Sequence, residues 1–237
     1  MIANIAAYKF VPIDDADDLR RHFSDLCLDL GLKGTILLAP EGINLFLAGP
    51  ADAISEFLAN LVRDARFSTI EPKWSWSDFV PFKRLRVRLK KEIVALRFAG
   101  IDPVRAPAPS ITAVELQRWY QEGRDFVILD TRNEWEFAAG TFENAVNPHL
   151  QSFSEFPQAA ASLASLKDKI VVTFCTGGIR CEKAAPLLLL KGFREVYQLQ
   201  GGILKYFEEC GGAHWRGNCV VFDDRGALDP QLRPAAQ

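Results

Sequence analysis

Two short apolar runs in the second half of the chain constrain its fold more than any other feature. Residues 126–129 are wholly apolar and lead into Asp130, and residues 170–174, apolar except for one threonine, lead into Cys175. Such runs are typical of strands buried on both faces of a parallel sheet. A weaker run lies at 195–199, and helical patterns separate the three. The sequence therefore predicts a doubly wound parallel α/β domain with its site at the carboxyl ends of the strands.

The first 76 residues show a different order of patterns. Apolar residues spaced three or four apart indicate helices, and alternating apolar residues on either side of Pro40-Glu41-Gly42 indicate a hairpin. The expected elements are a strand over 5–11, a helix after Asp14, hairpin strands over 35–39 and 43–48, a helix from Pro50 and a strand over 69–76. The order β-α-β-β-α-β predicts a ferredoxin-like α+β domain.

A basic segment follows the last of these strands. Residues 73–97 contain eight Lys or Arg residues but only two acidic ones, although the whole chain has a net charge of −2. Basic and aliphatic residues alternate over 84–90, so an extended strand would place its cations on one face. The candidate RNA-binding residues are Lys83, Arg84, Arg86, Arg88 and Lys90.

The basic segment allows two interpretations. It is either an ordinary solvated sheet face or a surface that follows a phosphate backbone. Four aromatic residues close to it either stack on bases or belong to a core. These residues are Trp74, Trp76, Phe79 and Phe82.

Composition places the chain among soluble globular proteins. Of its 237 residues, 49% are apolar and 24% are charged, and no apolar run approaches the roughly 20 residues of a membrane span. The five cysteines are odd in number and include no CxxC pair, which argues against a disulfide framework. We expect a cytoplasmic protein with no membrane association, and the sequence leaves its oligomeric state open.

The positions of the prolines suggest how the chain divides into domains. Three prolines fall within seven residues at Pro103, Pro107 and Pro109, which is typical of a stiff linker. The expected organisation is a ferredoxin-like, basic, RNA-binding domain over 1–100, a linker over 101–109, the doubly wound α/β domain over 110–212 and a C-terminal tail over 213–237 that frays near its end.

The residues around Cys175 combine several features of a reactive thiol. The cysteine ends a predicted buried strand, two glycines follow, and a helix is expected to begin after Arg180. Loop N–H groups, the helix N-terminus and the arginine charge would all favour the thiolate. Gly177 and Gly178 are expected to provide positive φ or a close backbone approach. The alternative is a buried core cysteine beside a glycine turn.

The string CTGGIRCEKA, which begins at Cys175, resembles the sulfur-carrying loop of rhodanese domains, and Asp130-Thr131-Arg132 resembles the end of that family's first strand. With APEGIN at 39–44 and QGGI at 200–203, the loop resembles the rhodanese-domain tRNA uridine hydroxylases more narrowly. These bacterial proteins are implicated in oxygen-dependent formation of 5-hydroxyuridine at the wobble position. The resemblance covers nearly the whole chain, and it implies that the domain over 110–212 is rhodanese-like.

The resemblance implies a role for each matched residue. Cys175 would be the catalytic nucleophile that forms a persulfide, and Asp130 and Arg132 would be supports. The active-site loop would comprise Thr176, Gly177, Gly178, Ile179 and Arg180. It also implies molecular oxygen as co-substrate and the anticodon region of tRNA as partner. The sequence itself shows no cofactor motif. Two alternatives are a persulfide sulfurtransferase of the thiosulfate type and a non-catalytic RNA-binding module.

The remaining candidates are weaker. Cys181 is either a resolving or supporting thiol or a core residue at the start of a helix. Cys210, His214 and Cys219 could supply three metal ligands, but no fourth ligand or CxxC pair lies near them, so no metal site is predicted. Thr141 stands where many rhodaneses have a histidine.

Overall fold

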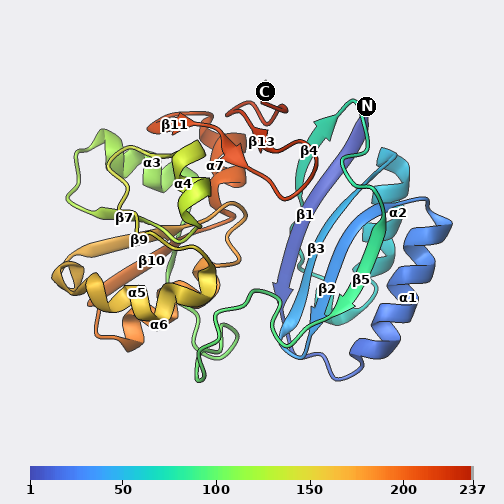
Figure 1. Cartoon of the computed structure of the whole chain (residues 1–237), viewed down its shortest axis with the longest axis horizontal. Helices are drawn as coiled ribbons and strands as arrows, with labels where there is room; N and C mark the ends of the chain where they lie inside the picture. Colours follow the sequence, from blue (N-terminus) through green and yellow to red (C-terminus); the bar gives the residue numbers. More distant parts are fainter. Residues whose placement is uncertain (236–237) are drawn as a thin grey trace. The chain divides into compact units, whose positions relative to one another are not determined.

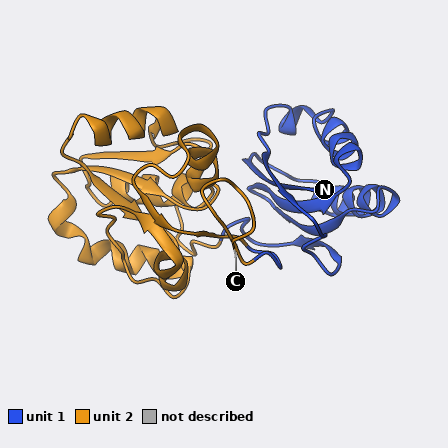
Figure 2. Cartoon of the chain, turned by 90° about the horizontal axis from the view of Figure 1, so that it is seen from above, with its two compact units in different colours: residues 1–94, 222–225 blue, residues 95–221, 226–237 orange. Residues whose placement is uncertain are grey.

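The computed structural model describes residues 1–235 of the chain, which divides into two compact units (Figure 2). The N-terminal unit comprises Met1–Val94 and Phe222–Arg225. The C-terminal unit comprises Ala95–Val221 and the residues from Gly226 onward. The segment expected as a linker, 101–109, thus lies within the C-terminal unit. No helix among the described residues has the length and apolar character needed to cross a membrane.

The N-terminal unit contains one five-stranded sheet in the order β4-β1-β3-β2-β5. Its elements are β1 (Ile2–Phe10), α1 (Ala16–Asp29), β2 (Lys33–Ala39), β3 (Gly42–Gly49), α2 (Ala51–Leu61), a 3-10 helix (Ala65–Phe67), β4 (Lys73–Ser77) and β5 (Leu85–Leu89). The first four strands have the connectivity of the predicted ferredoxin-like fold, which is confirmed. The basic segment adds β5 as an edge strand, parallel to β2.

Both helices of this unit cover the same face of the sheet (Figure 1). α1 buries Phe23 and Cys27, and α2 buries Phe57, whose ring centroid lies 5.9 Å from that of Phe23. Alternate strand residues such as Ile36 and Leu45 complete this core. Burial of these apolar side chains, at about 25 cal/mol per Å², is the main force holding the helices to the sheet.

The C-terminal unit contains a four-stranded parallel sheet in the order β6-β10-β9-β7. Helices lie on both faces, with α3, α4 and α7 on one side and α5 and α6 on the other (Figure 1). The elements are β6 (Ser110–Ile111), α3 (Ala113–Gln121), β7 (Val127–Asp130), α4 (Glu134–Ala139), β8 (Gly140–Phe142), α5 (Phe156–Ser162), β9 (Ile170–Phe174), α6 (Cys181–Leu190), β10 (Glu195–Leu199) and α7 (Gly202–Cys210). The predicted doubly wound parallel domain is confirmed.

The segment expected as a C-terminal tail is structured instead. It forms β11 (Trp215–Gly217), β12 (Cys219–Val220) and β13 (Ala227–Leu228), and β11 pairs with β8. The reason is apolar burial, because the Trp215 ring meets the Phe142 and Phe207 rings edge-on at 5.1 and 5.3 Å. Residues 236 and 237 of the predicted tail lie outside the described residues.

Candidate active site

Cys175 lies directly after β9, at the carboxyl edge of the parallel sheet, as its position after an apolar run predicts. Its side chain is buried, with 1% of its surface exposed. Residues 176–180 form the loop between β9 and α6, and the backbone N–H of Gly178 donates a hydrogen bond to Cys175 Sγ at 3.2 Å. The sulfur therefore lies within a loop that offers it a backbone donor, as a thiolate requires.

The two glycines of the loop have different roles. Gly178 has φ 99°, a conformation that side chains rarely adopt. Gly177 does not have a positive φ, and a Cβ built on it would meet no atom within 4 Å. The expectation that both glycines are required by the loop backbone is thus wrong for Gly177, because its conformation is one that other residues share.

Several contacts decide the charge of the Cys175 sulfur. Burial alone would raise the pKa of the thiol, but a hydrogen bond from Cys181, the charge of Arg180 and the backbone N–H groups of both residues together lower the pKa of Cys175 to about 6. The sulfur is therefore held as a thiolate at neutral pH, which is the nucleophilic form.

Cys181 is fully buried at the first position of α6, where the sequence left its role open. Burial, the hydrogen bond that it gives to Cys175 and the negative charge on Cys175 all raise the pKa of the Cys181 thiol. Its sulfur also lies 3.6 Å from Thr131 Oγ1. Cys181 thus keeps its proton and uses it to stabilise the neighbouring thiolate.

Arg180 is held by a residue that the sequence analysis missed. Its guanidinium contacts the buried carboxylate of Glu136, at 3.1 and 3.2 Å from Oε1 and 3.0 Å from Oε2. Glu136 also accepts a hydrogen bond from the Asn133 N–H at 3.0 Å, as part of a capping box at the start of α4. The sequence signal was the Asn-x-x-Glu spacing after Arg132, which ties α4 to the loop.

Asp130 and Arg132 form a fully buried ion pair behind the site. The Arg132 guanidinium donates to both carboxylate oxygens of Asp130 and to the Gly140 carbonyl oxygen at 2.6 Å. Thr141, which stands where many rhodaneses have histidine, donates to Asp130 Oδ2 at 3.1 Å. These hydrogen bonds join the end of β7 to β8, and both charged side chains are buried away from solvent. Such an arrangement is typical of residues that support a site rather than react in it.

The N-terminus of α7 is hydrogen-bonded to the backbone of the active-site loop. The N–H groups of Ile203 and Leu204 donate to the carbonyl oxygens of Cys175 and Thr176 at 3.0 and 3.1 Å. Gly202 has φ 65°, and a Cβ built on it would lie 2.4 Å from the Cys175 carbonyl oxygen. The sequence contained this signal in the string QGGI, which contributed to the resemblance but to no predicted site residue.

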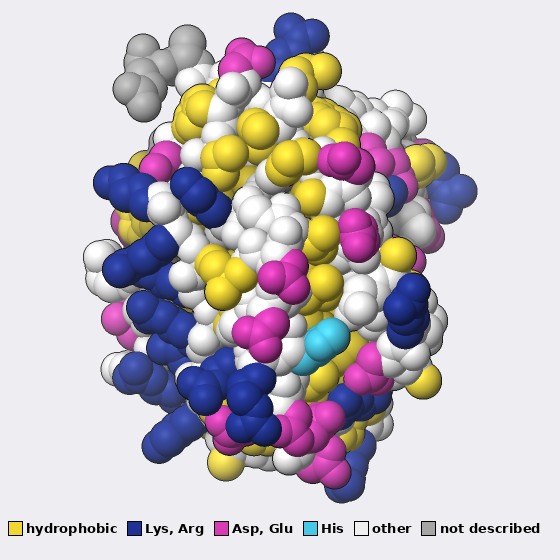
Figure 3. Space-filling view, turned by 90° about the vertical axis from the view of Figure 1, so that its right-hand side faces the viewer, with side chains coloured by type: hydrophobic (Ala, Val, Ile, Leu, Met, Phe, Trp, Pro, Cys, Tyr) yellow, Lys and Arg dark blue, Asp and Glu magenta, His cyan; other side chains and the backbone are white. Residues whose placement is uncertain are grey.

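The predicted basic strand shows the expected alternation. Arg86 and Arg88 are exposed, whereas Leu85 and Val87 pack against the core, and Lys83, Arg84 and Lys90 are also exposed. Lys and Arg side chains gather along one edge of the face that Figure 3 shows. A role in RNA binding remains a prediction.

The two tryptophans do not lie beside the basic strand. β4, which carries Trp74 and Trp76, and β5 lie at opposite edges of the sheet. Trp74 packs against the core, while Trp76 and Phe79 are exposed. Trp74 and Trp76 pair in register with Ile5 and Ala3, so they lie on the face that the helices cover.

The three weak ligand candidates have other contacts. The His214 ring stacks on Tyr120 at 4.4 Å, and the buried Cys219 Sγ lies 3.7 Å from the Val220 carbonyl oxygen. Over residues 1–235, no group of three or more His, Cys, Asp or Glu side chains is arranged to hold a metal ion.

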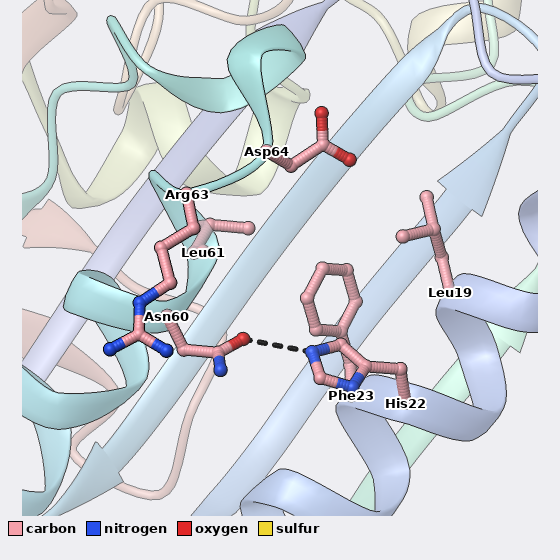
Figure 4. A pocket seen from close by; sticks show the side chains of 7 residues that line it. All are labelled: Leu19, His22, Phe23, Asn60, Leu61, Arg63 and Asp64. Carbon is pink, nitrogen blue, oxygen red and sulfur yellow. Dashed lines mark hydrogen bonds between the residues drawn. The ribbon is translucent and has the colours of Figure 1, made fainter.

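An open cavity of about 310 Å³ lies in the N-terminal unit (Figure 4). It is lined by Leu19, His22, Phe23, Asn60, Leu61, Arg63 and Asp64. Figure 4 shows a hydrogen bond between the His22 imidazole and the Asn60 side chain, with 2.8 Å between His22 Nε2 and Asn60 Oδ1. None of the predicted site residues lines this cavity, so it is separate from the thiol site.

Comparison with known proteins agrees with this arrangement. A family model described as a UPF0176 acylphosphatase-like domain matches residues 2–93, and the rhodanese-like domain model matches residues 112–209. A curated protein of Cupriavidus taiwanensis named tRNA uridine(34) hydroxylase is 58% identical over 240 residues, covering 99% of this chain and 85% of the relative. The chain belongs to the tRNA uridine(34) hydroxylase family. A family member from Bordetella avium is 54% identical, covering 98% of this chain and 99% of the relative.

Solved structures match a smaller share of the chain at lower identity. A rhodanese-like domain from Anabaena is 22% identical, with a TM-score of 0.40, over 46% of this chain and 79% of that chain.

The charge on Cys175 predicts a pH dependence. The ultraviolet absorbance of the thiolate, taken as the difference between the wild-type chain and Cys175→Ser, should titrate with a midpoint of about 6. Because the pKa is lowered, the thiolate is present above this pH and is lost as the pH falls through it. Cys181→Ala removes the S–H donor and should raise the midpoint, and Cys181→Ser, which keeps an O–H donor, should raise it less. A wild-type midpoint at the ordinary value of 9.0 would contradict the arrangement.

Proposed function

We propose that this chain hydroxylates uridine 34 of tRNA at C5, with Cys175 as its catalytic thiol and molecular oxygen as co-substrate. One oxygen atom enters the base, and the other leaves as water when an external reductant supplies two electrons and two protons. The observation that carries the proposal is the stabilised thiolate of Cys175 in a chain whose full-length relatives are named tRNA uridine(34) hydroxylase. The exposed cations of β5 supply charge suited to the phosphates of the anticodon region. A cytoplasmic location, where tRNA is present, is part of the same proposal.

In this reaction the residues around Cys175 control the charge of its sulfur and the access of water to it. Gly178 and Cys181 hold the sulfur as a thiolate by hydrogen bonding, and Arg180 adds a positive charge whose position Glu136 fixes. The loop excludes bulk water from the sulfur, since Cys175 is almost fully buried. Cys175 thus has the properties of a nucleophile poised for attack on an electrophilic atom.

The relatives also favour this function over a sulfurtransferase. The curated proteins that align with almost the full chain are named as hydroxylases and include both units. A sulfurtransferase acting on a small donor would use the Cys175 loop and leave the exposed cations of the N-terminal unit without a role. A non-catalytic RNA-binding module would need no stabilised thiolate.

Measuring 5-hydroxyuridine in tRNA tests this proposal. A bacterial strain that lacks its own hydroxylase of this family should regain 5-hydroxyuridine in tRNA digests when it expresses the wild-type chain. Cys175→Ser should leave the digest at the level of the empty vector, with protein abundance checked by immunoblot. Restoration of 5-hydroxyuridine by Cys175→Ser would contradict a catalytic role for the thiol, and no restoration by the wild-type chain would contradict the proposed function.

A further inference from the structure

The sheet of the N-terminal unit has one face that α1 and α2 do not cover (Figure 1). The side chains on this face alternate with those of the core, because successive residues of a strand point to opposite faces. The register of the sheet joins five of them into one row across all five strands. From β4 to β5 the row is Lys73, Ala6, Phe46, Thr35 and Arg86.

Within β3, this row is more accessible than the positions on either side of it. Phe46, its central member, is half-buried, and Arg86 at its end is exposed. Toward one end of β3 the neighbouring residue on the same face is Asn44, which is buried and donates to the Ile93 carbonyl oxygen at 3.2 Å. Toward the other end it is Ala48, which is buried and pairs with Asn4. Phe46 is therefore a half-buried aromatic residue between two buried positions of β3.

The cross-strand partners of Phe46 have small side chains. Ala6 and Thr35, its partners on the adjacent strands, are both small. Arg86 lies two strands from Phe46, about 10 Å away at about 4.8 Å per strand spacing, and Arg88 is the next exposed cation along β5. An aromatic ring with small cross-strand partners and with cations about 10 Å away suits a base and its flanking phosphates.

We propose that Phe46 is a platform on which this chain stacks an unpaired nucleobase of its RNA substrate, with Arg86 and Arg88 against the adjoining phosphates. The inference rests on the proposed function for the identity of the RNA, and it extends that function from a charged surface to a site for single-stranded RNA. In a duplex the bases are paired and covered by their neighbours in the stack, so the platform accepts only an unpaired base from a loop or a single-stranded end. The anticodon loop supplies such bases.

The experiment measures RNA binding by the full chain. Fluorescence anisotropy gives the Kd for an anticodon stem-loop RNA and for a blunt RNA duplex of the same length. We expect Phe46→Leu, which keeps the apolar volume but removes the ring, to weaken stem-loop binding about 5- to 100-fold and to leave duplex binding unchanged. Phe46→Tyr, which keeps the ring, should retain the wild-type affinity. Arg86→Gln should weaken binding of both RNAs and reduce the salt dependence by about one phosphate contact.

Equal stem-loop affinity of Phe46→Leu and the wild-type chain would overturn the platform. So would equal losses in the Leu and Tyr variants, since these would reflect repacking of the sheet rather than stacking. Thermal melts of both variants show that the compared chains are folded. RNA binding is measured apart from hydroxylation, so the two proposals can fail separately. Absence of 5-hydroxyuridine would contradict the proposed function but not the stacking of a base on Phe46. Loss of the stacking result would contradict the platform but not the hydroxylation.

Discussion

Replacing Asp130 by alanine is expected to lower the free energy of unfolding of the C-terminal unit by about 3–5 kcal/mol. The Arg132 side chain has no exposed surface, and its Nε and Nη2 donate to Oδ1 and Oδ2 of Asp130 at 3.0 and 2.7 Å. Removing the carboxylate leaves a full positive charge in the core. The Gly140 carbonyl oxygen would remain as an acceptor, but a neutral dipole does not offset an ionic charge out of water.

Urea unfolding followed by circular dichroism checks this prediction. The matched control is Glu115→Ala, which breaks a pair of 3.8 Å with Arg118 in the same unit, where both side chains are partly exposed. Solvent screens such a pair, so the control should change stability by no more than about 1 kcal/mol. Asp130→Asn keeps the shape and one acceptor oxygen and should lie between the two. If Asp130→Ala were as stable as Glu115→Ala, the buried pair would not support the fold.

Replacing Gly202 by alanine is expected to lower formation of 5-hydroxyuridine about 100-fold or more while the chain remains folded. The new Cβ would lie 2.4 Å from the Cys175 carbonyl oxygen and 2.7 Å from the Gly178 nitrogen, both backbone atoms of the active-site loop. The loop can relieve these contacts only by moving away from α7, which breaks the hydrogen bonds from Ile203 and Leu204. A displacement of about 1 Å at a catalytic group is enough for a loss of this size.

Gly211→Ala provides the control at the other end of α7. Its φ of 62° and the 65° of Gly202 both lie in the region that side chains rarely adopt, so both substitutions strain the backbone, but a Cβ at Gly211 would meet no atom within 4 Å. Gly211→Ala should therefore lose some stability and keep its activity. The two variants are compared by single-turnover formation of 5-hydroxyuridine on purified tRNA. Similar activity in both would mean that contact with the loop is not what Gly202 provides.

The order of strands and helices follows largely from local patterns. The alternation of Leu85, Arg86 and Val87 predicts which side of β5 meets the core, because the side-chain period of a strand is two wherever it pairs. The pattern does not indicate the strand's neighbour. Pairing of β5 with β2 places Arg86 in the same row as Phe46, and no spacing within the sequence predicts that row.

Contacts distant in sequence explain the failures of prediction. Trp74 and Trp76 are close to the basic segment along the chain but lie at the opposite edge of the sheet. Trp215 belongs to a segment with little periodicity, and its burial depends on rings from β8 and α7 that only the folded chain provides.

The sequence by itself determined the two fold classes, the position of Cys175 at the end of a strand and the basic face of β5, since each depends on periodicity or on residues adjacent in the chain. Only the tertiary structure decided how the loop that stabilises the thiolate is held in place. Glu136 reaches Arg180 across 44 residues, and the N-terminus of α7 reaches the carbonyl oxygens of Cys175 and Thr176. These contacts form only where the parallel sheet brings the ends of separate strands to one edge, so the position of the active-site loop is a property of the fold.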